Sequence, residues 1–154
     1  MSNMNKQQAS TLVEVLIAVS IIALVLTAVS AMMTMSIKLA NSNEQKQLAL
    51  QKTQEALEFF RKERAVNSWR SFSNALVNDG VYCLSSLPES VASMSAKLGA
   101  CTDEEVLEAA KYQFQREANI SFNNANSLKV IVEVFWQDNK KTKNLAIEQN
   151  FDNY

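Results

Sequence analysis

Apolar and polar positions divide the chain into three consecutive patterns, and the first is a long apolar run. From Thr11 to Ile37 nearly every residue is apolar or carries a hydroxyl, and Glu14 is the only charged residue between Lys6 and Lys38. As a helix this run would be about 40 Å long at 1.5 Å per residue. A bilayer core needs about 20 apolar residues, so the pattern predicts a helix that can span a membrane.

The second pattern is polar with an apolar stripe, and it continues without glycine or proline until Gly80. Helical spacing relates the stripe positions Ala49/Leu50, Thr53, Ala56/Leu57 and Phe60. We therefore predict one helix from about Thr11 to about Arg70, bent near residues 41–43. Its second half is an amphipathic stem.

We expect structural roles for the aromatic and charged residues of the stem. The aromatic residues Phe59, Phe60, Trp69 and Phe72 are expected on the face that the rest of the protein covers. The run Arg61–Arg64 mixes both signs of charge, so it is expected to be a solvated face and not a nucleic-acid patch.

The third pattern alternates with a period of two, and it follows a turn signal at Asn78-Asp79-Gly80. The apolar members are Tyr112, Phe114, Ala118, Ile120 and Phe122, then Leu128, Val130, Val132, Val134 and Trp136, then Leu145, Ile147 and Phe151. Arg116 interrupts the first set. We predict three antiparallel strands in a meander whose apolar face is covered by the stem, which is an α+β fold.

Between the turn signal and the strands, a short helix is expected over Asp103–Ala109. Thr102 and Glu105 have the spacing of a capping box. The acidic residues Asp103, Glu104, Glu105 and Glu108 raise the possibility of calcium, which takes several oxygen ligands. Acidic residues at a helix N-terminus have a simpler explanation in the helix dipole, so no metal site is predicted.

Cys83 and Cys101 are the only two cysteines. If this part of the chain is exported, it lies in an oxidising compartment, and we expect a disulfide. Two buried thiols are the alternative. The spacing differs from that of a CxxC motif, which argues against redox chemistry.

Composition argues against most enzyme classes. The chain has no histidine, two glycines and one proline, and its net charge is −1. It therefore lacks the commonest general base and metal ligand and has no glycine-rich phosphate loop. We predict no catalytic residues, no cofactor and no binding of nucleic acid.

The apolar run has three interpretations. It could be a secretory signal peptide cleaved after Ala31, or a plain signal anchor. Both leave Glu14 unexplained, and a carboxylate costs about 2.5–3.5 kcal/mol at the centre of a membrane helix and less near its end. An ionisable group at membrane depth indicates a function that supplies it with a partner. The alternative for Glu14 is a carboxylate that reaches the membrane interface by snorkelling and has no partner.

The segment Ala9-Ser10-Thr11-Leu12-Val13-Glu14-Val15-Leu16-Ile17-Ala18 resembles the cleavage motif of the type IV pilin-like family. That motif has a short polar leader, a small residue at the cut, and an apolar helix with glutamate as its fifth residue. The resemblance implies that prepilin peptidase cuts between Ala9 and Ser10 and N-methylates Ser10. The new amine at Ser10 would then pair with Glu14 of a neighbouring subunit and set the axial register.

This resemblance also implies an organisation and a set of partners. Residues 1–9 would be the leader, 10–40 the transmembrane and filament-core helix, 41–78 the stem, and 79–154 the globular head. The implied partners are other pilin subunits, prepilin peptidase, an inner-membrane platform protein, an assembly ATPase and the lipid bilayer. The expected function is that of a minor subunit of a type IV pilus, with its head outside the cytoplasmic membrane before assembly into a filament. A pseudopilin of type II secretion, a signal-anchored binding module and a secreted enzyme are the alternatives.

Overall fold

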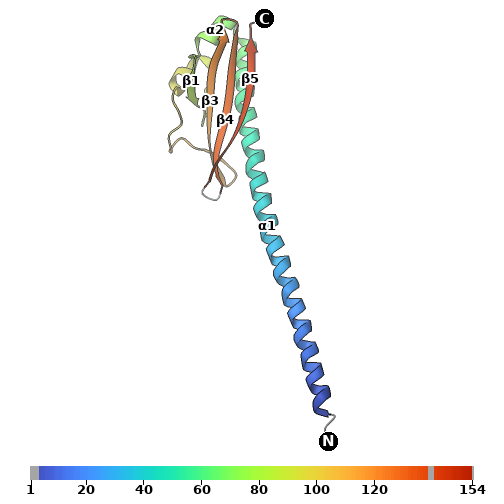
Figure 1. Cartoon of the computed structure of the whole chain (residues 1–154). Coiled ribbons are helices and arrows are strands. Elements are labelled where there is room, and N and C mark those ends of the chain that lie inside the picture. Colours follow the sequence, from blue (N-terminus) through green and yellow to red (C-terminus); the bar gives the residue numbers. More distant parts are fainter. Residues whose placement is uncertain (1–3, 139–140, 154) are drawn as a thin grey trace. The chain divides into compact units, whose positions relative to one another are not determined.

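The computed structural model describes residues 4–138 and 141–153, with side chains described from Leu12 onward (Figure 1). It divides into two compact units, Met1–Ser42 and Asn43–Tyr154. Helix α1 (Met4–Val66) supplies all the described backbone of the first unit and the opening segment of the second. The predicted fold class, a long N-terminal helix with an antiparallel sheet in an α+β head, is confirmed.

Helix α1 is continuous through residues 41–43, and it differs from the prediction at its C-terminal end. It ends at Val66 instead of near Arg70. The Asn67 side chain donates to the Glu63 carbonyl, at 2.9 Å. The Ser68 side chain accepts a hydrogen bond from the Ser71 amide and begins the short helix α2 (Trp69–Asn74). A local N-cap therefore starts a second helix where the sequence analysis continued the first.

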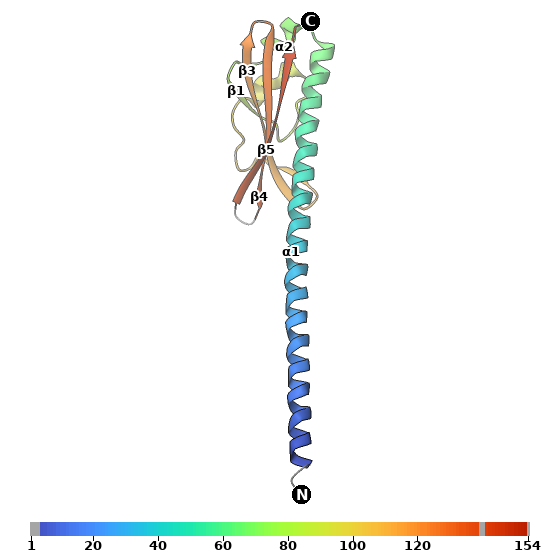
Figure 2. The same cartoon turned by 45° about the vertical axis from the view of Figure 1, so that its right-hand side comes forward.

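Residues 43–66 of α1 bury one stripe against the sheet (Figure 2). The buried positions are Gln45, Ala49, Thr53, Ala56, Leu57, Phe60 and Glu63. They recur every three or four residues, as the amphipathic pattern predicts. Leu50, which the sequence analysis placed on the stripe, is 38% exposed.

The sheet has five strands where three were predicted. The predicted meander is β3 (Tyr112–Asn124), β4 (Ser127–Asp138) and β5 (Lys141–Asp152), and all its pairings are antiparallel. The additional strands are β1 (Gly80–Cys83) and β2 (Leu107–Ala109), and both pair with β3. The sheet order is β1-β3-β4-β5, and β2 extends the β3 side. The turn signal at residues 78–80 is confirmed, because the Gly80 amide donates to the Val77 carbonyl across it at 3.1 Å.

The predicted helix over Asp103–Ala109 is wrong. Residues 107–109 form β2, and a short 3-10 helix, η1 (Val91–Lys97), precedes Cys101. The capping-box side chains still meet: the Glu105 carboxylate accepts from the Thr102 amide at 2.9 Å and from the Thr102 hydroxyl at 3.1 Å. These hydrogen bonds lower the pKa of Glu105. They stabilise a single turn, and pairing with β3 takes the following residues into the sheet.

The core lies between the sheet and the helices of the second unit. Its main cluster combines Phe60 of α1 and Phe72 of α2 with buried residues of the strands. Phe59 and Trp69 are half-buried and pack against this cluster, so the aromatic residues of the stem have the core role that was predicted. The strand members are Tyr82, Ala118, Ile120, Leu128, Val130, Val132 and Phe151.

Candidate processing and assembly site

The apolar segment of α1 is exposed along its whole described length. Every side chain from Leu12 to Asn41 is exposed, and Leu24 and Met35 reach 71% and 76%. Helix α1 contains a stretch long and apolar enough to cross a membrane. An exposed apolar surface of this length requires lipid or protein around it.

Four hydroxyl groups within this segment form hydrogen bonds to the backbone of the helix itself. Ser20, Thr27, Ser30 and Thr34 each donate to a backbone carbonyl three or four residues earlier, at 2.7–3.0 Å. A hydroxyl bonded in this way does not need water or a partner chain. These four side chains are therefore compatible with a hydrocarbon environment.

Glu14 is the exception, because an ionised carboxylate has no proton to donate to a backbone carbonyl, as the hydroxyl groups do. The side chain is exposed, and in the portion with described side chains it has no ion pair or hydrogen bond. Ala9 and Ser10 lie five and four residues before it on the same helix, and their side chains fall outside the described part. The structure places the three predicted residues on one continuous helix. The proposed contact between Ser10 and a neighbouring Glu14 stays a prediction.

In the head, Arg116 joins the stem to the sheet. It is 1% exposed, and its guanidinium donates to the Leu84 carbonyl at 2.9 Å and the Lys52 carbonyl at 2.8 Å. The Glu55 carboxylate lies 3.5 Å away. Burial lowers the pKa of Arg116 and the Glu55 charge opposes that shift, but arginine stays protonated at any physiological pH. The residue that broke the alternation is thus a buried cross-link between α1, β3 and the end of β1.

Glu63 is a second buried charge, and it corrects the prediction that residues 61–64 form a solvated face. The side chain is 4% exposed. Its carboxylate accepts from the Val91 amide at 2.7 Å and from the Asn67 side chain at 3.2 Å. It therefore binds the start of η1 to the stem. Arg61 and Lys62 are exposed as expected, whereas Arg64 is half-buried and donates to the Asp152 carbonyl.

Cys83 and Cys101 form a disulfide in the structure, as expected from the sequence. Cys83 ends β1, and the bond fixes the far end of the loop that carries η1. Beside it, the Cys101 amide donates to the Glu117 carboxylate at 2.8 Å. Both the covalent bond and this hydrogen bond attach the loop to the sheet.

Replacing both cysteines by serine is expected to lower the free energy of unfolding of the head by about 3 kcal/mol, because the bond closes a loop of 18 residues in the unfolded chain. Chemical denaturation of the full chain measures this loss. Intact-mass analysis without reductant should also give a mass about two daltons below that of the dithiol, since one bond forms between two thiols. Native cysteines that alkylate readily would contradict the assignment.

No group of histidine, cysteine or acidic residues able to hold a metal ion occurs among the described residues. The acidic residues at 103–105 and 108 are separated by the turn and by β2. Glu105 accepts hydrogen bonds from Thr102.

The partners of Arg116 and Glu63 were not predicted. Arg116 had a signal in the sequence, a charge at a position where the alternation predicts an apolar residue. Glu63 had none, because a charge agrees with the exposed position that was expected there.

Together, the apolar exposed helix and the head describe a membrane-anchored protein with a folded domain beyond its anchor. Comparison with known families matches residues 4–30 to the prokaryotic N-terminal methylation motif. This motif is the prepilin-type signal of type IV pilins and pseudopilins, so the predicted resemblance is confirmed. The match includes Ala9, Ser10 and Glu14, and it supports a pilin-like or pseudopilin structural protein. No curated protein and no solved structure gave a significant match to the chain.

Proposed function

We propose that this protein is a minor subunit of a type IV pilus or of a related pseudopilus. The observation that carries the proposal is Glu14, set inside an exposed apolar helix at the fifth position after the Ala9–Ser10 bond and within the matched motif. A charge in this setting is unfavourable in lipid and becomes useful where a neighbouring subunit brings a cation.

In this proposal the four parts of the chain have separate roles. Residues 1–9 are removed by prepilin peptidase. Residues 10–40 wait in the cytoplasmic membrane and then enter the filament core, while residues 41–78 and 79–154 form the stem and the exported head. A platform protein and an assembly ATPase move the subunit between these states. Packing in the fibre replaces lipid around each helix with neighbouring helices, so burial of the exposed apolar surface is retained.

Determination of the mature N-terminus tests the proposal directly. A protein that begins at Ser10, with a methylated amine, supports it. A protein that begins at Met1 or Ser2 identifies a signal anchor, and one that begins at Met32 identifies a secreted form; either result rejects the proposal. Edman degradation or peptide mass spectrometry of membrane-extracted protein distinguishes the three.

Processing is expected to require a small residue at Ala9. A peptidase that cuts beside a polar leader has little room for a branched side chain at the cut. Ala9→Leu should therefore accumulate as the uncut precursor in the membrane fraction, and Ala9→Gly should be processed at least as fully as the wild type. Electrophoretic mobility and intact mass report the cut. If both variants were processed like the wild type, the assigned cleavage site would be wrong.

A further inference from the structure

A polar groove lies on the sheet face turned away from the stem. Along β4 the side chains of Val134 and Trp136 face the core, so those of Phe135 and Gln137 point to the opposite side. Two adjoining hollows of about 440 and 170 Å³ meet at Gln113 and Gln137, which line both. The larger continues from there around the edge of the sheet to Lys111 and Tyr112. Gln115, Phe135 and Thr142 line the smaller hollow. That hollow is below the usual size of a small-molecule site by itself, and the larger one that adjoins it at Gln113 and Gln137 is within that range.

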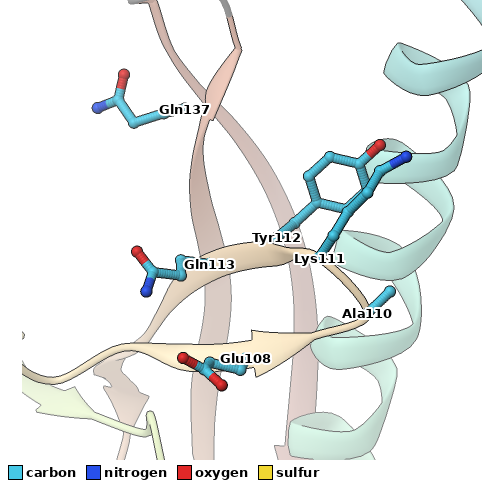
Figure 3. Close-up of a pocket in the computed structure, with 6 residues that line it drawn as sticks. All are labelled: Glu108, Ala110, Lys111, Tyr112, Gln113 and Gln137. Carbon is cyan, nitrogen blue, oxygen red and sulfur yellow. The ribbon is translucent and has the colours of Figure 1, made fainter.

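Strand register arranges the groove side chains in two neighbouring rows. In the first row Glu108 pairs with Gln113, and Gln137 pairs with Thr142. Figure 3 shows Glu108, Gln113 and Gln137 extending to one side, whereas Tyr112 and Lys111 extend toward α1. In the second row Phe135 lies between Gln115 and Asn144. The groove is therefore an array of amides around one aromatic ring.

Hydrogen bonds orient three of these four amides and leave that of Gln113 available. The Asn144 side chain donates to the Glu133 carboxylate. The Gln137 side chain donates to the Thr142 hydroxyl, and that of Gln115 donates to the Thr102 carbonyl, each at 2.8 Å. The carbonyl oxygens of both amides remain as acceptors, and Thr142 keeps its own proton to donate. The Gln113 amide has no hydrogen-bond partner in the described portion of the chain and offers a donor and an acceptor. Sugar hydroxyls both donate and accept, so such a set matches them.

Phe135 is the apolar residue among these polar side chains. Its side chain is half-buried and lines the smaller hollow. The face of an aromatic ring packs favourably against weakly polarised C–H groups, which line one face of a pyranose ring. An amide array without an aromatic ring would have less affinity for a sugar, because hydrogen bonds exchanged with water contribute little net free energy.

Charges around the groove exclude an anionic ligand. Asp103 and Glu108 are exposed and line the two hollows. The only basic residue that lines them in the described structure is Lys111, whose ammonium lies 3.4 Å from the Glu44 carboxylate. The nearby Tyr112 side chain and Glu44 raise the pKa of Lys111, so this lysine stays protonated. Nucleic acids and acidic polysaccharides need unpaired lysine or arginine residues.

We propose that the head binds an uncharged oligosaccharide in this groove, with hydrogen bonds to Gln113, Gln115, Gln137 and Thr142 and with Phe135 against a sugar ring. This function goes beyond assembly into a filament, and it does not depend on the assignment of the cleavage site.

The full chain in lipid nanodiscs tests the proposal, since glycoside detergents would compete for the groove. Calorimetric titration with cellohexaose, maltohexaose and chitohexaose should detect binding of at least one. Gln113→Ala and Phe135→Ala should each weaken that binding about tenfold or more. Ile131→Ala is the matched control: it also removes a half-buried apolar side chain from the same face of β4, but Ile131 lies outside the hollows, so the affinity should be unchanged.

Gln113→Ala keeps the test decisive if Phe135→Ala unfolds, because Gln113 is exposed. The proposal is overturned if none of the three sugars binds, or if Gln113→Ala binds as the wild type does. It is also overturned if the oligonucleotide dT20 or heparin binds with an affinity that Gln113→Ala reduces and added salt abolishes, because that would show an anion site.

Discussion

Glu14→Ala is expected to remove this protein from surface fibres while leaving it well inserted in the membrane. In an assembled bundle the amine at Ser10 would lose its partner, and breaking one side of a buried ion pair costs about 3–5 kcal/mol. A loss of that size lowers an incorporation equilibrium by more than about a hundredfold. In lipid the same change removes an unfavourable charge, so insertion improves.

The measurement is the amount of this protein in sheared fibres relative to the membrane fraction, for wild type and Glu14→Ala. Glu89→Ala is a suitable control, because it removes an exposed carboxylate from a loop of the head and should incorporate normally. Unchanged incorporation of Glu14→Ala would leave Glu14 as a tolerated charge at the membrane interface, as in a signal anchor. It would remove the main physical argument for assembly.

Arg116→Ala is expected to cause the largest loss of stability among single substitutions in the head. The change removes a buried side chain and leaves the Leu84 and Lys52 carbonyls without their donor. A buried carbonyl left without its donor costs about 1–3 kcal/mol, and truncation of a large buried side chain adds the cost of a cavity, so the expected loss is about 3 kcal/mol or more. For a domain of this size that corresponds to a fall in Tm of more than about 10 °C.

Thermal unfolding of the full chain, followed by near-ultraviolet circular dichroism, measures this effect. Arg61→Ala is the matched control: that guanidinium is exposed and bonds the Gln149 side chain at 2.8 Å, and exposed interactions contribute about 0–1 kcal/mol. Arg116→Met preserves volume and should fall between the two. If Arg116→Ala were as stable as Arg61→Ala, the network would not link the stem to the sheet in the way its geometry indicates.

Periodic parts of the head were predictable from the sequence because one physical requirement governed many residues. Alternation from Tyr112 to Phe151 gave the three long strands, and the helical stripe from Ala49 to Phe60 gave the face of the stem that covers them. In both cases burial of one face fixes the pattern over many positions. A single exception such as Leu50 does not change the result.

Short elements were not predictable, because distant partners decide them. β1 has four residues and no alternation to detect, and it exists through its pairing with residues 117–120 of β3. The capping-box hydrogen bonds between Thr102 and Glu105 do form, as the sequence predicts. A helix does not follow, because Leu107 pairs with Phe114 in the sheet. In a segment of only a few residues the local conformational preference is weak, so pairing with a distant strand decides the secondary structure.

The burial of Glu63 was also not predictable from the sequence. Glu63 lies in a run of mixed charge that is typical of a solvated surface, and the approach of the Val91 amide makes it a buried acceptor. The processing segment shows the opposite situation. Glu14 was identifiable because its surroundings in the chain are uniformly apolar, so its contrast is visible without any structure.

The contacts between the stem and β5 have a consequence for the order in which the parts of the head fold. Arg61 and Arg64 each bond a residue 88 positions later, on β5. Phe151, three residues from the end of the chain, contacts Phe72 across a ring-centroid distance of 5.7 Å. Contacts so distant in sequence form late, because the long loop between them must close first. During synthesis the apolar stripe of the stem therefore stays uncovered until β5 has been made and has paired with β4, and formation of this last strand pair is the event that closes the core.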